Sequence, residues 1–326
     1  MSNNQLPENS TRLKPLIILI AVPAIGYLGM MIWAGHAEVA AAVAMVGFGG
    51  LLVALGLSAN NLFLRYLRWH RYLHSVHRGL PALRSFSIYL SGFALTASPG
   101  KVGELIRSVF LKKLGVRYAD SVAVFFSDRL SDLMAVLVLV AVGLWKYDVG
   151  RLALLVVGFV GVTVLILTRA PTFASALVAW SENRSHPRIK QLLLAAPRLI
   201  RSVHQCITGY NLLLGFALSI MAWASQGMAL YYLATFMGAH ITMTEAIFVH
   251  SLSILAGALS LLPGGIGATD LTMAGMLMLY QLDAPQAVAC AILLRLITLW
   301  FAIALGVIAL KHINTPGAPR VDLEPD

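Results

Sequence analysis

Residues 98–107 read Ser-Pro-Gly-Lys-Val-Gly-Glu-Leu-Ile-Arg and interrupt an apolar run that would otherwise resemble a membrane helix. The run before them, 83–98, is too short to cross a bilayer, because a spanning helix needs about 20 apolar residues. Pro99 then removes a backbone donor, and the glycines that follow it loosen the chain. Residues 262–270, Leu-Pro-Gly-Gly-Ile-Gly-Ala-Thr-Asp, repeat the pattern of Pro-Gly, a further glycine and a carboxylate. Two broken helices of the same design are therefore predicted.

The composition is that of a protein embedded in a membrane. Of its 326 residues, 59% are hydrophobic and 12% are charged, whereas soluble domains average about 25% charged residues. An all-α integral membrane protein is predicted. The net charge of +10 then indicates cytoplasmic loops facing anionic lipid headgroups, and no nucleic acid is expected as a partner. Cys206 and Cys290 define neither a disulfide framework nor a metal site.

Hydropathy predicts about six full transmembrane helices and two broken segments within one transmembrane domain, residues 15–312. The full spans are expected at 15–35, 40–64, 118–145, 151–168, 210–237 and 284–312. The broken segments are expected at 83–98 with 99–115, and at 244–262 with 263–281. Residues 169–209 have apolar side chains at helical spacing among basic ones, which predicts an amphipathic connection on the cytoplasmic membrane surface. The tail at 1–14 is expected in the cytoplasm, and the tail at 313–326 is expected to be disordered.

The positions of Lys and Arg set the expected orientation, because positively charged loops stay in the cytoplasm. Both flanks of the first broken segment are basic, whereas the turns at 238–243 and 281–285, which flank the second, lack Lys and Arg. Each segment should therefore enter the membrane and return, from opposite sides, as a re-entrant helical hairpin. Both termini then lie in the cytoplasm, and the chain lies in the bacterial inner (cytoplasmic) membrane.

The chain also contains a weak internal repeat, residues 40–145 against residues 210–312. A Pro-Gly pair, an acid and a later arginine occur in the same order and at similar spacing in both units. Because a single helix separates the units, they should run in opposite directions across the membrane. Inverted repeats of this kind build many transporters, whose broken helices form a site near the bilayer midplane.

The landmarks of this repeat are the candidate residues of a central cavity. A half-helix N-terminus attracts anions, and an arginine can bind a phosphate through two hydrogen bonds. The predicted substrate-binding residues are Pro99, Gly100, Gly103, Glu104, Arg107, Arg129, Pro263, Gly264, Gly267, Asp270 and Arg295.

Structural roles for the charged members of this set stay open. Arg129 can instead pair with Glu104 or Asp128, and Arg295 can pair with Asp270. The acids Glu104 and Asp270 can bind a coupling cation, form those ion pairs, or cap the half-helices.

A basic and aromatic patch, Arg65, Arg68 and Trp69, follows the expected end of the second span. It is either the ordinary positive-inside signal with an interface tryptophan or a cytoplasmic vestibule that gathers lipid headgroups. The sequence shows no metal-ligand cluster, no nucleotide-cradling loop and no nucleophile–base arrangement, so neither a cofactor nor an enzymatic activity is expected.

Together, the Pro99–Arg107 motif, the Asp128-Arg129 helix, the Pro263-Gly264 motif and the Arg295 helix resemble the lysylphosphatidylglycerol synthase transmembrane family, the flippase-type membrane half of the bacterial multiple peptide resistance factors. The resemblance covers about residues 12–312. It implies lipid movement between leaflets, with the arginines and acids of these motifs in the central site. Asp270 stands where the family would be expected to carry Glu at least as often. No soluble synthase domain follows Lys311, so a stand-alone member that does not make lysyl lipids is expected.

The predicted function is that of a flippase-like transporter for an anionic phospholipid or a lipid-linked glycan. The alternatives are a secondary transporter of a small anion, and a non-transporting membrane partner of a lipid-modifying enzyme. Expected partners are membrane lipids with anionic headgroups, with a homo-oligomer and a lipid- or glycan-modifying enzyme as further candidates.

Overall fold

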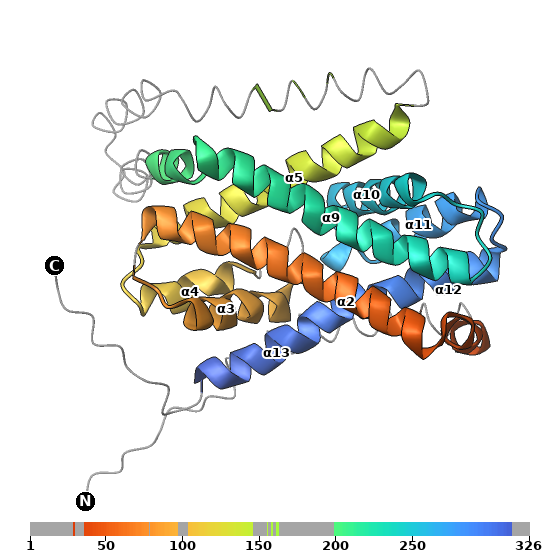
Figure 1. The fold of residues 1–326 in the computed structure, drawn as a ribbon. Coiled ribbons are helices and arrows are strands. Elements are labelled where there is room, and N and C mark those ends of the chain that lie inside the picture. Colours follow the sequence, from red (N-terminus) through yellow and green to blue (C-terminus); the bar gives the residue numbers. More distant parts are fainter. Residues whose placement is uncertain are drawn as a thin grey trace, which may run out of the picture.

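The structure, a computed structural model, describes residues 29, 36–77, 79–96, 104–145, 155, 158, 161–162 and 199–314. This part of the chain is helical and contains no strand (Figure 1). The all-α fold expected from the composition is therefore confirmed. The described residues leave out the expected span at 15–35, most of that at 151–168, most of the amphipathic connection and nearly all of both tails, so the count of six spans stays a prediction.

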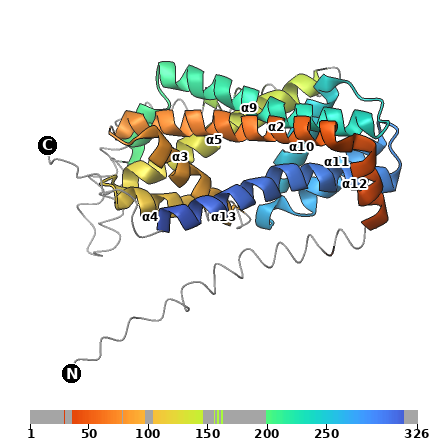
Figure 2. The same ribbon diagram turned by 60° about the horizontal axis from the view of Figure 1, so that its bottom comes forward.

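Three long apolar helices dominate the described part. α2 (His36–Val76) and α9 (Tyr210–Phe236) lie side by side in both ribbon views (Figures 1 and 2). The third comprises α12 (Ala284–Arg295), one π-helical turn η4 (Leu296–Trp300) and α13 (Phe301–Asn314). All three are long and apolar enough to cross a membrane, which fits their nearly unbroken apolar sequences. α5 (Tyr118–Leu144) packs against both α2 and α9.

The second broken segment forms a helical hairpin. α10 (Met243–Leu259) runs to a short 3₁₀ turn, η3 (Pro263–Gly265), and the chain then returns as α11 (Ala268–Met278). The N–H of His240, just before α10, donates to the carbonyl of Tyr280, just after α11, at 3.1 Å. The two ends of the segment therefore lie together.

The first broken segment has the same components. α3 (Ala82–Ser91) continues into the 3₁₀ turn η1 (Gly92–Leu95), and α4 (Ile106–Lys112) returns beside α3. The intervening residues, which include Pro99, Gly100 and Gly103, lie outside the described part of the chain.

Contacts between the two halves of the chain occur in matched pairs. α5 of the first half packs on α10 of the second, and α13 of the second half packs on α3 and η1 of the first. In the same way α5 contacts α9, and α12 contacts α2. The contact of α13 with the first hairpin is close: a Cβ added at Gly306 would lie 2.3 Å from the backbone nitrogen of Ala94. Each contact between the halves thus has a counterpart with the halves exchanged.

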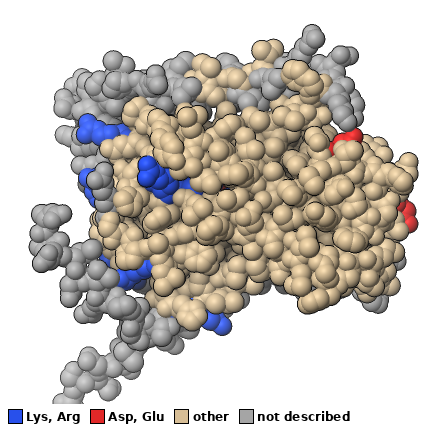
Figure 3. Space-filling model, viewed as in Figure 1, with Lys and Arg blue, Asp and Glu red and all other residues tan. Residues whose placement is uncertain are grey.

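Exposed charge is divided between the two ends of the bundle. Figure 3 shows Lys and Arg over one end of the visible face, where α2 ends and α9 begins, and acidic residues only at the other end. The helices also expose large apolar side chains such as Phe48, Leu213 and Leu279, each at least 70% exposed. A surface of this kind suits a bilayer with the basic end in the cytoplasm.

Two helices match the sequence expectation within one residue at both ends: α5 was expected at 118–145 and α9 at 210–237. The expected end of the second span at residue 64 is wrong, because α2 continues as helix to Val76. The basic connection expected after residue 64 is therefore largely the last three turns of a helix. Arg65, Arg68 and Trp69 of this segment are buried against neighbouring helices, whereas Arg71 is exposed.

Candidate functional site

Two arginines of α2 pair with two aspartates of α5 inside the bundle. Arg68 lies 2.5 Å from Asp128 Oδ1 and 2.8 Å from Asp132 Oδ1, and Arg65 lies 3.1 Å from Asp132 Oδ2. Arg68 has no exposed surface and also donates to Ser219 of α9. Residues three or four positions apart share a helix face, so Arg65 with Arg68, and Asp128 with Asp132, present two matched pairs of charges.

This network corrects the expected surface position of the basic and aromatic patch. Arg65, Arg68 and Trp69 were expected at the cytoplasmic surface, but they are 5%, 0% and 2% exposed. The reason is the longer α2, which carries all three residues into contact with other helices. Trp69 packs beside the ring of Tyr89 from the first hairpin. The charges of the patch therefore form interhelical ion pairs.

Glu104, at the start of the returning arm of the first hairpin, joins the same network. One carboxylate oxygen accepts a hydrogen bond from Thr96 Oγ1 at 2.8 Å, and the other lies 3.2 Å from Arg107 and 3.6 Å from Arg129. Arg107 also donates to the carbonyl of Tyr89 and stacks on the Tyr89 ring. Arg107 therefore ties the two arms of the hairpin together, and Glu104 links that hairpin to α5.

Arg129 is the member of the network that reaches open space. Its Nη2 lies 2.6 Å from Asp128, 3.2 Å from Asp132 and 3.6 Å from Glu104. Its side chain is 19% exposed, and its Nε has no hydrogen-bond partner. Arg129 therefore forms the ion pairs considered from the sequence and also lines a cavity, while phosphate binding stays a prediction.

In the second hairpin, Arg295 holds the tip of the hairpin to α12. Its Nε donates to Asp270 Oδ1 at 2.9 Å, and its Nη2 donates to the carbonyl of Gly264 at 2.9 Å. The other oxygen of Asp270 accepts a hydrogen bond from the N–H of Gly267 at 3.0 Å. Asp270 therefore caps α11 and neutralises Arg295, which are two of the structural roles considered from the sequence.

The second part of this broken segment was expected to start at residue 263, with Pro263 in its first helical turn, and this start needs a correction. Pro263 opens only the 3₁₀ turn η3, and α11 begins at Ala268 after Gly267. Gly264, Gly265 and Gly267 all have positive φ, between 63° and 87°, and this glycine-rich bend separates the proline from the helix. The N–H of Gly267, the N-cap of α11, is already bonded to Asp270.

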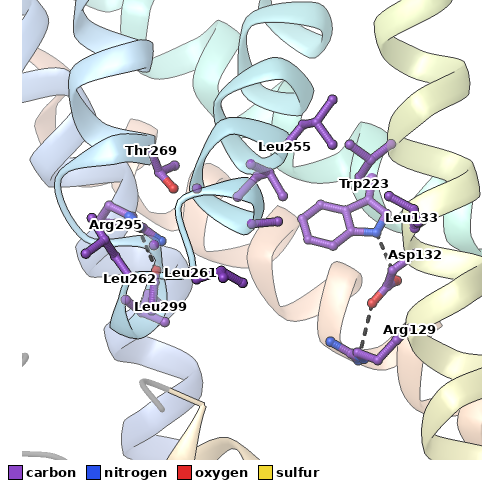
Figure 4. A pocket seen from close by; sticks show the side chains of 16 residues that line it. Arg129, Asp132, Leu133, Trp223, Leu255, Leu261, Leu262, Thr269, Arg295 and Leu299 are labelled. Atoms are coloured by element: carbon purple, nitrogen blue, oxygen red, sulfur yellow. Dashed lines mark hydrogen bonds and ion pairs between the residues drawn. The ribbon is translucent and has the colours of Figure 1, made fainter. Parts of the chain in front are cut away.

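A cavity of about 310 Å³ lies between these two sets of charges (Figure 4). Arg129 and Asp132 of α5, with Trp223 of α9, form one wall, and Arg295 stands across from them. The remaining lining residues are mostly apolar or small: Leu133, Val136, Ile254, Leu255, Gly257, Ala258, Leu261, Leu262, Gly264, Gly265, Thr269 and Leu299. The cavity thus combines two separated guanidinium groups with apolar walls.

Three of the predicted site residues line this cavity: Arg129, Gly264 and Arg295. Glu104 and Asp270 contact those arginines from behind, and Pro99, Gly100 and Gly103 lie outside the described residues. Among the described residues no group of three or more His, Cys, Asp or Glu could hold a metal ion.

Asp132 and Trp223 are among the lining residues that were not identified from the sequence. Asp132 follows Asp128 by four residues, a spacing that could have placed it on the same face. Trp223, whose Nε1 donates to Asp132 Oδ1 at 2.9 Å, stands in an apolar helix and gave no signal.

Comparison with known proteins gives consistent relatives. The family model described as lysylphosphatidylglycerol synthase TM region matches residues 16–306. A UPF0104 membrane protein of Methanothermobacter thermautotrophicus is 26% identical over 304 residues, which cover 86% of this chain and 88% of the relative. The UPF0104 membrane protein PH1989 of Pyrococcus horikoshii is 23% identical over 327 residues, covering 92% and 97%.

Proposed function

Because the chain belongs to the lysylphosphatidylglycerol synthase transmembrane family, we propose that it moves an anionic phospholipid or a lipid-linked glycan between the leaflets of the membrane. The observation that carries the proposal is the cavity with Arg129 and Arg295 on opposed walls. A guanidinium exposed to a cavity at membrane depth is costly unless an anion or water meets it. A phosphate group in the cavity would contact Arg129 through the donors that face it.

The apolar walls favour a lipid over a soluble anion. Leu261 and Leu262 line the cavity, and their side chains are 70% and 46% exposed. These leucines stand at the tip of the second hairpin, between α10 and η3. A headgroup could therefore enter beside the hairpin tip while its acyl chains stay against apolar side chains, whereas a cavity for a soluble ion needs no such apolar edge.

The mechanism follows from the matched contacts between the halves. Two inverted repeats that exchange partners in this way can rock about a fixed central site, which would expose the cavity to one leaflet and then to the other. The two hairpins would act as re-entrant elements, the first opening from the cytoplasmic side and the second from the opposite side. The basic end of the bundle, which holds the ends of α2 and α13, supports a cytoplasmic C-terminus.

The test is transport of fluorescent lipids by purified protein in liposomes. Lipids with phosphatidylglycerol, phosphatidylcholine and polyprenyl-phosphate-sugar headgroups are placed in both leaflets, and outer-leaflet dye is quenched chemically with and without imposed pH and voltage gradients. We expect selective movement of an anionic lipid that is lost in Arg129→Gln. The control is Arg71→Gln, which removes an exposed arginine bonded to Asn211, away from the cavity.

Failure of well-folded protein to move any of these lipids under every gradient would refute the proposal. Gradient-driven uptake of radiolabelled inorganic phosphate by the same liposomes would then identify a small-anion transporter. Inactivity in both assays would favour a membrane partner of a lipid-modifying enzyme, and co-purification of such an enzyme would identify it.

A further inference from the structure

The charged network beside the first hairpin contains more positive than negative groups. The described ion pairs join four guanidinium groups to three carboxylates: Arg65, Arg68, Arg107 and Arg129 against Glu104, Asp128 and Asp132. Six of these seven residues are at most 6% exposed. At full ionisation the network therefore carries one positive charge more than its acids neutralise.

The ion pair on the opposite wall of the cavity, Arg295 with Asp270, has no net charge. Arg295 pairs with Asp270 at 2.9 Å, and its Nη2 donates to the carbonyl of Gly264. Asp270 also satisfies the N–H of Gly267. Both charges of this half are thus compensated by each other, although Arg295 occupies the same place in the repeat as Arg129.

The excess charge reaches the cavity at Arg129. The other three arginines of the network have side chains between 0% and 5% exposed, whereas that of Arg129 is 19% exposed and lines the cavity. Its Nε is buried without a hydrogen-bond partner. Arg129 therefore brings a network that has one more guanidinium group than carboxylates to the wall of the cavity.

We propose that the cavity selects headgroups carrying a single negative charge, a phosphodiester bound on Arg129, with Arg295 acting as a positioning residue for the second hairpin. This inference deepens the proposed function and rests on it for the lipid part of the ligand. A phosphodiester monoanion brings the network to neutrality. A zwitterionic headgroup leaves the excess charge in place, and a phosphomonoester dianion replaces it with an excess of the opposite sign.

A charge left uncompensated away from bulk water is costly. The charge of the headgroup should therefore match the excess charge of the network. Two unit charges about 4 Å apart attract by about 1 kcal/mol in water and by about 4 kcal/mol near a protein surface. A cavity that is partly apolar lies between these conditions. A mismatch of one charge should therefore change lipid affinity by about tenfold, equivalent to about 1.4 kcal/mol.

The experiment measures binding, not transport, so that it is independent of the energy source. Native mass spectrometry of the full-length protein in detergent gives Kd values for phosphatidylcholine, phosphatidylglycerol and phosphatidic acid, the last at pH 9 to favour its doubly charged form. We expect phosphatidylglycerol to bind about tenfold more tightly than either of the others. Equal or tighter binding of phosphatidic acid would overturn the proposal.

Three variants test the origin of the selectivity. Arg129→Gln should lower the preference for phosphatidylglycerol over phosphatidylcholine about tenfold, whereas Arg129→Lys should keep it. Glu104→Gln, which adds one positive charge behind the cavity wall, should shift the preference towards phosphatidic acid. Unchanged ratios in Arg129→Gln and Glu104→Gln, with normal thermal stability, would refute a role for the charge balance.

Two further arms separate this inference from the proposed function. Arg71→Gln removes an exposed arginine that donates to Asn211 and lies outside the network, and it should leave the ratios unchanged; a tenfold shift would show that the charge balance of the network is not the cause. Glycerophosphoglycerol, the phosphatidylglycerol headgroup without acyl chains, should not compete with the lipid at equal concentration. If it competes equally while the charge preference holds, the lipid function fails and the charge rule stands.

Discussion

Replacing Gly257 with alanine should force the second hairpin apart. Gly257 lies in α10 where α11 crosses it, and an added Cβ would be 1.9 Å from Oγ1 of Thr269 and 3.5 Å from the Cα of Gly265. Because the obstructing oxygen is on a β-branched side chain and backbone lies behind it, the contact cannot be relieved by a simple rotation. Overpacking of this kind costs about 1–3 kcal/mol, against a gain of up to about 1 kcal/mol from replacing a helical glycine.

The hairpin itself supplies the control. Gly275 lies in α11, and a Cβ there would meet nothing within 4 Å. Gly275→Ala should therefore be neutral or stabilise the protein by up to about 1 kcal/mol. The assay is the thermal unfolding midpoint in detergent, followed by intrinsic tryptophan fluorescence, where 1 kcal/mol corresponds to about 2–4 °C for chains of 150–250 residues.

The decisive comparison adds Thr269→Ala to Gly257→Ala. Removing Oγ1 should restore most of the midpoint lost by Gly257→Ala, because the obstructing atom is gone. If Gly257→Ala is as stable as Gly275→Ala, or if the second substitution gives no recovery, the packing of α10 against α11 described here is wrong.

Two further predictions concern the charged groups. Asp270→Ala and Arg295→Ala should each destabilise the protein by about 3–5 kcal/mol, since each leaves a buried charge unpaired. A double-mutant cycle on the thermal midpoint should give a coupling free energy of about 1–3 kcal/mol. Additive effects of the two substitutions would rule out the ion pair. Arg68→Leu should unfold the protein or lower its stability by more than about 3 kcal/mol, because Asp128 and Asp132 would lose Arg68 as a buried partner. Arg71→Leu, at an exposed position of the same helix, should change the stability by less than about 1 kcal/mol. Equal thermal shifts in the two variants would contradict the buried network.

The broken helices could be predicted from the sequence because local rules determine them. Proline and glycine next to a short apolar run disfavour a continuous helix whatever surrounds them, and the structure breaks the second segment between Leu259 and Ala268. The length of α2 could not be predicted in the same way. Its last turns carry Arg65 and Arg68, whose charges indicate a loop until partners are known, and those partners, Asp128 and Asp132, are on another helix.

In the candidate site, too, residues with unusual sequence neighbours could be predicted, whereas contacts between residues distant in the sequence could not. Arg129 and Arg295 were identified because an arginine in an apolar helix is unusual by itself. Capping a half-helix was one of the roles left open for Asp270, and its carboxylate does accept from the N–H of Gly267 at the start of α11. Trp223 could not be found, since nothing near it in the sequence indicates that its indole N–H bonds to Asp132. Sequence symmetry also suggested equivalent arginines, whereas their partners differ in number.

That inequality bears on how the two halves could move. The ion pairs of Arg65, Arg68, Arg107 and Arg129 all join residues within 40–145, and that of Arg295 joins residues within 210–312. Contacts across the halves include hydrogen bonds from Trp223 to Asp132 and from Arg68 to Ser219, which cost far less to exchange than a buried ion pair. Relative motion of the halves could thus leave these ion pairs intact. The cavity between them would then present the same excess charge at Arg129 in both arrangements, as an alternating-access site for one anion requires.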